Sequence, residues 1–262
     1  MASVACYTRA MPETILVDDT NTITTITLNR PDKRNPIGPA TCGELVAALA
    51  AIQANAAVRV VILTGAGSVF SAGGDLSAMQ QPSGPSATLP ELLLAMHDLG
   101  KPIIAMVNGP ALAGGLGLMV ACDLVVAADS AVFGTTEIAV GLWPMMITAE
   151  ITRSIGRKKT LDMMLTGRKL DAAEALACGL VTRVVPAAQL EAETRALAAS
   201  IATRSPAAIA LGLHAFYGSQ DMELAPALDY LQGELGRVLA LEDAAEGIQA
   251  FLAKRKPVWS GR

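Results

Sequence analysis

A run of twenty residues without a charge, from Ile103 to Cys122, constrains the fold of this chain more than any other feature. Its length would suffice for a helix that crosses a bilayer. Polar and helix-breaking residues interrupt the run, namely Asn108, Gly109, Pro110, Gly114, Gly115 and Gly117. A strand-like segment, 124–127, follows directly. We therefore predict a buried strand, a turn and a buried helix here, with no insertion into a membrane.

The glycine pair in this run has a chemical implication. Gly114 and Gly115 fall where the apolar segment is expected to turn into a helix. The first turn of a helix has unpaired N–H groups and a partial positive charge, and glycine lets another atom approach them closely. Such donors can stabilise an oxyanion. A second candidate donor loop lies upstream at 70–75, and a lone carboxylate, Glu137, follows a further glycine downstream.

Strand-like and helix-like segments alternate along most of the chain. Strands are predicted over 22–28, 58–63, 103–107 and 124–127, and helices over 41–55, 89–99 and 112–121. This alternation is typical of an α/β fold. A loop is predicted over 80–88. From residue 187 onward the chain looks wholly helical, with helices predicted over 191–202, 206–219, 223–241 and 244–254.

Composition narrows the class of protein. The 262 residues are 52% hydrophobic and 17% charged, which favours a large core over disorder. A formal net charge of −4 argues against a nucleic-acid partner, which requires a basic face. The cysteines (Cys6, Cys42, Cys122 and Cys178) lie far apart, so neither a metal site nor a disulfide framework is predicted. With no evident signal peptide, this pattern predicts a cytoplasmic protein.

The two glycine loops and the downstream glutamate, in this order, resemble the crotonase superfamily, also called the enoyl-CoA hydratase/isomerase family. The resemblance runs from 28–31 through 165–167 and 177–181 to 251–255. It implies an α/β fold, a crotonase-like spiral of repeated strand-strand-helix units. The spiral core with the coenzyme A and active site is expected over 1–200. A C-terminal helical part, 201–262, is expected to cover the site and to pack a homotrimer or a dimer of trimers.

The resemblance also assigns catalytic roles. Gly74 and Gly114 match the two positions whose backbone N–H groups bind the thioester oxygen of the substrate, and Glu137 matches a catalytic glutamate. The family therefore implies that an enolate forms between the two donors while Glu137 carries a proton. From the residues alone, an ordinary turn at Gly74 and an exposed carboxylate at Glu137 remain open alternatives.

Three further positions match contacts to coenzyme A. Ala72 matches a carbonyl that meets the adenine, whereas Arg34 and Lys254 match residues that contact the phosphates. Lys254 would reach the site from the same chain or from a neighbouring subunit. A solvated surface is the alternative for Arg34 and Lys254. No cofactor is expected beyond the coenzyme A of an acyl-CoA thioester substrate.

One position departs from the hydratase pattern. Hydratases of the family have a second glutamate three residues after the second oxyanion glycine, where this chain has Gly117. Two carboxylates hold and activate a water, whereas one is enough to move a proton between two carbons. The sequence therefore favours isomerisation of an enoyl-CoA double bond. Hydration of a 2-enoyl-CoA and a non-catalytic protein that binds CoA esters are the alternatives.

The segment that follows Glu137 also departs from the family. Met145 and Met146 stand where small glycines are common, and they are interpreted as core residues, with a reshaped acyl pocket as the alternative. Glu150 is a candidate for a substitute acid. His97 and His214 match no catalytic position and are interpreted as structural.

Overall fold

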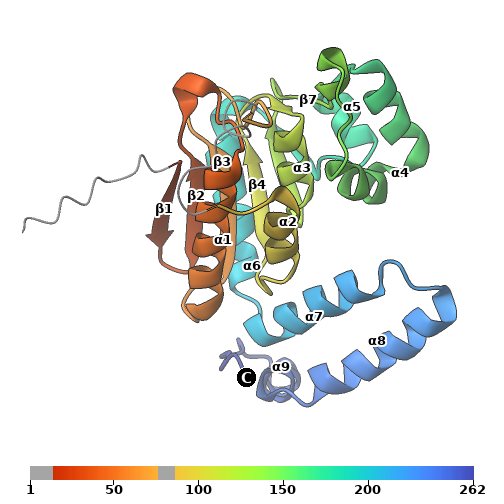
Figure 1. Cartoon of the computed structure of the whole chain (residues 1–262). Coiled ribbons are helices and arrows are strands. Elements are labelled where there is room, and N and C mark those ends of the chain that lie inside the picture. The colour runs from red at the N-terminus through yellow and green to blue at the C-terminus, as the bar shows by residue number, and fades with distance from the viewer. Residues whose placement is uncertain (1–13, 76–85) are drawn as a thin grey trace, which may run out of the picture.

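A six-stranded sheet with strand order β1-β2-β3-β4-β6-β9 forms the centre of the protein (Figure 1). The computed structural model describes residues 14–75 and 86–262. The strands are β1 (Ile15–Thr20), β2 (Ile23–Leu28), β3 (Val60–Gly65), β4 (Ile103–Val107), β6 (Leu124–Ala128) and β9 (Arg183–Val185). All neighbouring strands run parallel except β1 and β2. The predicted α/β class is confirmed.

A second, smaller sheet is stacked beside the ends of these strands. It contains β5 (Ala111–Leu112), β7 (Val132–Gly134) and β8 (Lys169–Asp171). Two single bridges extend it, one between Ile37 and Gly74 and one between Ser71 and Ala111. Successive turns of the chain thus place one strand in the large sheet, a short extended segment in the small one, and then a helix. This is the predicted spiral.

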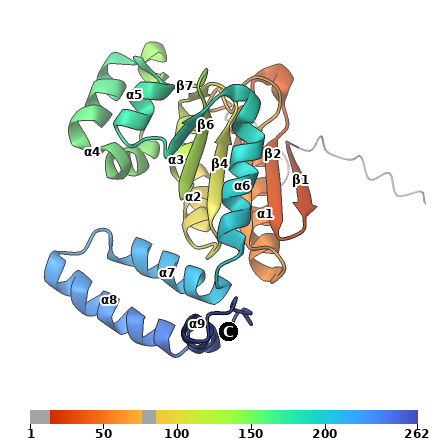
Figure 2. The same ribbon diagram turned by 180° about the vertical axis from the view of Figure 1, so that it is seen from behind.

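Helices cover both faces of the large sheet. The helices α1 (Pro39–Ala54), α2 (Leu89–His97) and α3 (Gly114–Val120) lie on one face (Figure 1), and α6 (Leu190–Ala202) lies on the other (Figure 2). Beside the small sheet are α4 (Ile147–Thr166) and α5 (Ala172–Ala177). Short 3-10 helices are η1 (Pro31–Lys33), η3 (Glu137–Val140) and η4 (Ala187–Gln189).

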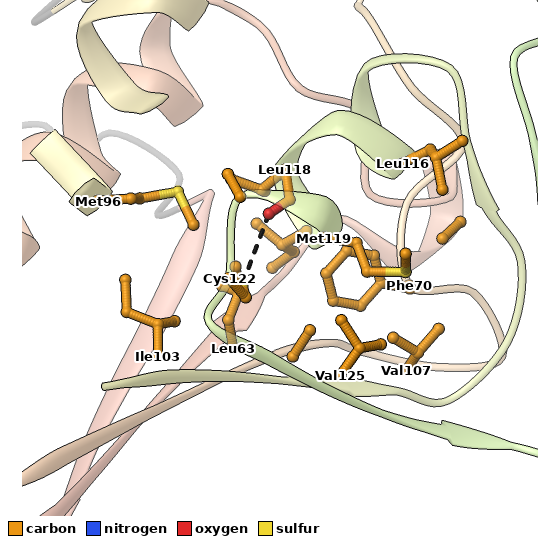
Figure 3. Packing of buried hydrophobic residues seen from close by; sticks show 14 of the residues in the cluster. Leu63, Phe70, Met96, Ile103, Val107, Leu116, Leu118, Met119, Cys122 and Val125 are labelled. Atoms are coloured by element: carbon orange, nitrogen blue, oxygen red, sulfur yellow. Dashed lines mark hydrogen bonds between the residues drawn. The ribbon is translucent and has the colours of Figure 1, made fainter. Parts of the chain in front are cut away.

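The main core lies between the large sheet and α1 to α3. Phe70, Leu116 and Met119 are fully buried there, and Cys122 donates its thiol hydrogen to the carbonyl of Leu118 (Figure 3). A smaller core joins the opposite face of the sheet to α6. Strands buried on both faces need apolar residues on both sides. This explains the continuous apolar run of β3 and β4.

Three helices form a separate group at the C-terminus: α7 (Pro206–Ser219), α8 (Leu224–Leu239) and α9 (Glu242–Leu252). The ring of Tyr217 on α7 stacks on His97 at 4.3 Å, and its hydroxyl donates to Asp123. Many large apolar side chains of this group are exposed, among them Leu224, Leu228, Leu235, Leu239, Phe251 and Leu252. The group therefore touches the core through α7 and presents an uncovered apolar surface.

Several local predictions need correction. The helix predicted over 112–121 begins at Gly114, because Ala113 has a φ of 50°, outside the helical region. The chain after residue 252 is not helical; this tail folds back instead, with Trp259 donating its indole N–H to the carbonyl of Thr203. Strands β1, β7, β8 and β9 and helices α4 and α5 were not predicted. The three-residue strands are too short to show a periodicity.

The uncharged run 103–122 contains the predicted strand and helix, and the short strand β5 lies between them, where only a turn was predicted. Over the described ranges, no single helix is long and apolar enough to cross a membrane. One pair of helical segments, Ala187–Ala202 with Pro206–Ser219, is long and apolar enough when taken together, but the pair is strongly bent. Most of the loop predicted over 80–88 lies outside the described residues.

Candidate active site

Two backbone N–H groups from different turns of the spiral lie side by side. The bridges of the small sheet bring the loop with Gly74 against the start of α3. A Cβ atom placed on Gly114 would lie 3.6 Å from the nitrogen of Gly74. Neither nitrogen donates a hydrogen bond to any residue that the structure describes. The two predicted donors are therefore brought together, and both are free to bind one oxygen atom.

The backbone around these donors is held in an unusual conformation. Ala113, just before Gly114, has a φ of 50° and a ψ of −131°. Its N–H donates to the carbonyl of Gly134 at 2.8 Å, and its own carbonyl accepts from Leu116 at 2.9 Å. A non-glycine residue in such a conformation costs free energy, which the surrounding contacts must offset. These bonds fix the direction in which the N–H of Gly114 points.

Glu137 follows β7 and is the first residue of η3. Its side chain is half-buried, and its Oε2 atom has no hydrogen-bond partner among the described residues. Burial raises the pKa of this carboxyl above its ordinary value, because the charged form loses hydration. A carboxylate that is poorly solvated and unpaired is a stronger base than one in water. This is the environment expected of a group that takes up a proton.

A pocket of about 880 Å³ joins the donors to this base. It is lined by Gly74, Gly114 and Glu137, and by Cys42 and Leu89 from the α1 and α2 side. The opposite wall is apolar and comes from one segment: Val140, Leu142, Trp143, Pro144, Met145, Met146 and Ile147. An oxyanion site and a base in one apolar pocket can remove a proton next to a carbonyl group.

The interpretation of two methionines as core residues was wrong. Met145 and Met146 are 68% and 47% exposed, and both line the pocket. Met146 caps the start of α4, so its backbone belongs to a helix end and not to the packed helix interior. Their location agrees with the alternative interpretation, in which the two methionines shape the acyl pocket.

The predicted coenzyme A contacts are only partly assembled in a single chain. Ala72 lines the pocket, and its N–H donates to the carbonyl of Arg34 at 2.9 Å. The side chain of Arg34 is exposed and does not line the pocket. Lys254 is exposed just after α9 and also lies outside the pocket lining. A contribution from Lys254 therefore requires another subunit or a movement of the C-terminal helices.

The space beside Gly117 is occupied. A Cβ atom placed on this buried glycine would lie 1.9 Å from Cγ2 of Ile147. Ile147 is 2% exposed and lines the pocket. The start of α4 therefore fills the space that a longer side chain at position 117 would need.

In residues 14–75 and 86–262, no second free carboxylate lines the pocket. Glu150 lies outside the pocket lining and faces His97 at 3.4 Å, so the structure does not support its role as a substitute acid. Glu91 does line the pocket, and sequence reasoning missed it. Its carboxylate accepts from the N–H of Thr88 at 2.6 Å, which lowers its pKa. The spacing of Thr88 and Glu91 is that of a capping box and could have located this helix start.

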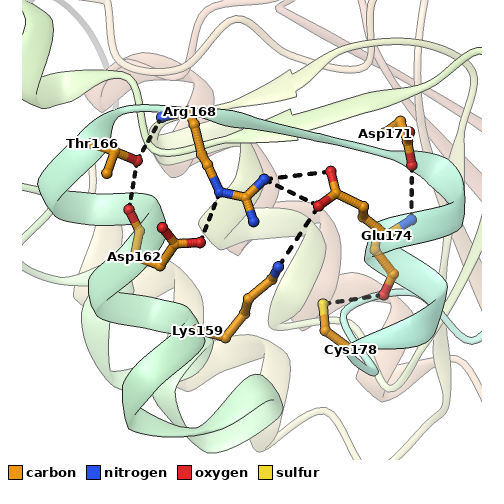
Figure 4. Close-up of polar contacts among 8 residues, drawn as sticks. Lys159, Asp162, Thr166, Arg168, Asp171, Glu174 and Cys178 are labelled. Carbon is orange, nitrogen blue, oxygen red and sulfur yellow. Dashed lines mark hydrogen bonds and ion pairs between the residues drawn. The ribbon is translucent and has the colours of Figure 1, made fainter.

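A network of ion pairs ties α4 to α5 (Figure 4). Arg168 donates to Asp162 at 2.7 Å and to Glu174 at 3.1 Å. Arg168 directly precedes β8, and β8 pairs with β7, the strand that leads to Glu137. A Cβ atom on Gly167, at the same turn, would lie 2.9 Å from Ile138. The network thus supports the segment that carries the base.

The cysteine, histidine and acidic side chains that the structure describes form no metal centre. Cys42, Cys122 and Cys178 are free thiols, and Cys6 lies outside the described residues. In residues 14–75 and 86–262, no group of three histidine, cysteine or acidic side chains is arranged to hold a metal ion.

Comparisons with known proteins identify the family of this chain. The sequence model of the enoyl-CoA hydratase/isomerase family matches residues 18–262. A putative enoyl-CoA hydratase of Thermus thermophilus is 36% identical over 90% of this chain and 96% of its own length. A probable enoyl-CoA hydratase of Rhizobium meliloti is 38% identical over 95% of this chain and 99% of its own.

Solved structures show the same relationship. The crystal structure of an enoyl-CoA hydratase from Bacillus anthracis superimposes with a TM-score of 0.89 at 34% identity, covering 95% of this chain and all of that one. An enoyl-CoA hydratase from Mycobacterium smegmatis gives a TM-score of 0.88 at 33% identity over 94% of this chain and 99% of its own. Matches of this extent and identity place the chain in the enoyl-CoA hydratase/isomerase family, the crotonase superfamily.

Proposed function

We propose that this enzyme isomerises the double bond of an enoyl-CoA, with Glu137 as the only acid and base. The observation that carries the proposal is that, among the described residues, Glu137 is the single free carboxylate in the pocket. Glu137 has an unpartnered Oε2 atom, whereas Glu91 is bound to Thr88. The space next to Gly117 is filled by Ile147. One carboxylate can move a proton between two carbons, but it holds a water poorly.

The steps follow from this arrangement. The ionised carboxylate of Glu137 removes a proton from the carbon next to the thioester of a 3-enoyl-CoA. The electron pair spreads into a dienolate whose oxygen accepts from the N–H groups of Gly74 and Gly114. The protonated Glu137 then returns the proton to the far carbon of the former double bond. The product is a 2-enoyl-CoA, and the carboxylate is regenerated.

Hydration of a 2-enoyl-CoA is the second candidate, because the relatives named above are called hydratases. Parallel assays of the purified protein with a 2-enoyl-CoA and a 3-enoyl-CoA separate the two reactions. A shift of the double bond in the 3-enoyl-CoA, with little water addition to the 2-enoyl-CoA, is expected. Water addition as the faster reaction would overturn the proposal, and tight binding without turnover would indicate a non-catalytic protein.

Gly117→Glu alone is expected to lower the melting temperature without introducing hydration. Its new Cβ would meet Cγ2 of Ile147 at 1.9 Å and Cβ of Ile147 at 2.6 Å, and crowding in a packed core destabilises the folded state. The double variant Gly117→Glu/Ile147→Gly removes both contacts and should add measurable water to a 2-enoyl-CoA. A well-folded double variant that adds no water would show that the lone carboxylate is not what limits the chemistry.

We also propose that the exposed apolar surface of α7 to α9 packs a homotrimer or a dimer of trimers. Leu224, Phe251 and Leu252 are each at least 74% exposed, which favours a partner surface. Such packing would bring the end of α9 to a second chain. Lys254, with Arg34 and Ala72, would then hold coenzyme A.

A cytoplasmic location stays a prediction, because a relative named as mitochondrial also matches the chain.

Lys254→Ala is expected to raise KM for CoA esters more than it lowers kcat. A phosphate contact far from the reacting carbons contributes equally to ground-state and transition-state binding. The effect should shrink at high salt, where the charge is already screened. The same assay on Lys256→Ala, a neighbouring exposed lysine, is the control. An unchanged KM at low salt would place Lys254 on an ordinary solvated surface.

A further inference from the structure

The apolar wall of the pocket ends in two exposed thioethers. Met145 and Met146, 68% and 47% exposed, both line the pocket that contains Glu137. Met222, 42% exposed, lies between α7 and α8 and does not line it. Four other described methionines are buried: Met96, Met119, Met163 and Met164. Among the described residues, two of the three exposed methionines therefore lie at the pocket.

The local backbone keeps these side chains at the pocket. The N–H of Met145 donates to the carbonyl of Trp143 at 2.8 Å. The hydroxyl of Thr148 donates to the carbonyl of Pro144 at 2.6 Å, and its N–H to the carbonyl of Met145 at 3.2 Å. Ile147, directly after the pair, is anchored against Gly117. The turn is therefore held on both sides, which keeps the backbone of both methionines at the pocket.

We propose that Met145 and Met146 form an oxidation site through which hydroperoxides weaken the binding of apolar acyl chains. This inference rests on the proposed function, since it takes an acyl-CoA as the ligand. The thioether sulfur attacks one peroxide oxygen, the O–O bond breaks and an S–O bond forms. The sulfur gives up two electrons to the peroxide, and a proton moves from the transferred oxygen to the departing one, which leaves as water from hydrogen peroxide or as an alcohol from an organic hydroperoxide. The sulfoxide is polar, and sulfoxide reductases can reverse its formation.

The thiol in the pocket is a weaker candidate for this reaction. Cys42 lines the pocket but is 3% exposed. Burial raises the pKa of its thiol to about 11. The thiolate is the reactive form, so Cys42 remains mostly protonated at neutral pH and reacts slowly. The methionine pair is therefore the part of the pocket that responds first to peroxide.

The expected effect depends on chain length. Each methylene group that loses its apolar contact costs about fourfold in affinity. A short acyl group makes few contacts with the wall, whereas a longer one covers more of it. Oxidation should therefore raise the Kd of octanoyl-CoA by at least about tenfold and that of butyryl-CoA by less than about twofold. General damage to the fold would weaken both ligands alike.

The test measures binding and modification directly. The intact protein is treated with graded hydrogen peroxide, and peptide mass spectrometry quantifies the sulfoxide at each methionine. Calorimetry then gives Kd for octanoyl-CoA and butyryl-CoA before treatment, after treatment and after incubation with methionine sulfoxide reductases. We expect Met145 and Met146 to oxidise before the buried methionines, a selective loss of octanoyl-CoA binding, and recovery after reduction.

Two variants complete the design. Met222→Leu removes an exposed methionine outside the pocket and should respond to peroxide as the unsubstituted protein does. Met145→Leu/Met146→Leu keeps side-chain volume nearly constant, and its Kd for octanoyl-CoA after peroxide should equal its own value before.

The possible failures are distinguishable. The inference is overturned if the double variant loses octanoyl-CoA affinity as strongly as the unsubstituted protein does. It is also overturned if Met222 oxidises while Met145 and Met146 do not. An untreated protein that binds neither CoA ester would instead refute the proposed function, and the inference with it.

Discussion

Glu137→Gln should lower kcat at least about 10²-fold, the low end of what general acid–base catalysis contributes. Glutamine cannot take up or return a proton, but it has nearly the same shape. The proposed oxyanion donors, Gly74 and Gly114, and the apolar wall are unchanged. The Kd of a saturated CoA ester should therefore barely move. Steady-state kinetics with a 3-enoyl-CoA, alongside calorimetric binding, checks both parts.

The same variant should be at least as stable as the unsubstituted protein at neutral pH. Burial raises the pKa of the Glu137 carboxyl, so the folded state favours the protonated form. The carboxyl therefore contributes to the free energy of unfolding at low pH, and this contribution is lost as the pH rises through the raised pKa. Glutamine does not ionise and so avoids that loss. At a pH above this pKa, the melting temperature of the variant should not be lower than that of the unsubstituted protein.

In the unsubstituted enzyme, kcat should decline as the pH drops through the raised pKa, because the base becomes protonated.

Glu150→Gln is the matched control. Glu150 lies on α4 close to the pocket wall but faces His97 outside it. Its substitution should leave kcat within about twofold, because it contacts no reacting atom. A Glu137→Gln enzyme that keeps a near-normal rate on its best substrate would remove Glu137 from the mechanism.

Gly114→Pro is expected to lower kcat by about 10²- to 10³-fold, the loss typical of removing one oxyanion donor. Proline has no N–H group, so the N–H of Gly74 would be left alone at the thioester oxygen. Gly114 is the first residue of α3, a position where proline is well tolerated. The substitution therefore removes the donor with limited cost to the helix. Single-turnover kinetics measures the chemical step.

Gly114→Ala separates the donor from crowding. Its Cβ would lie 3.6 Å from the nitrogen of Gly74, an ordinary contact, and its N–H is kept. The alanine enzyme should retain much more activity than the proline enzyme, and circular dichroism should show both folded. If a folded proline variant matches the alanine variant in rate, then Gly114 is not a donor to the oxyanion.

Local structure was predictable where its causes are local. The strand 103–107 and the helix 206–219 were predicted at the positions that the structure has. Apolar β-branched runs and helical periodicity depend on residues within a few positions of one another. The short strands β7 and β8 were missed, because they exist only through pairing with each other and with β5. Without β7, the placement of Glu137 could not be derived from its neighbours in sequence.

The sequence by itself determined the α/β class and the family resemblance, and through that resemblance it made Gly74, Gly114 and Glu137 the candidate site residues. These depend on residue types and on steric preferences of short segments. Only the tertiary structure decided that the two glycine nitrogens lie side by side, without another partner among the residues that the structure describes. It also decided that Ile147 fills the space beside Gly117 and that Met145 is exposed at the pocket. Burial and free hydrogen-bonding capacity depend on which distant segments pack together, and no local pattern encodes that.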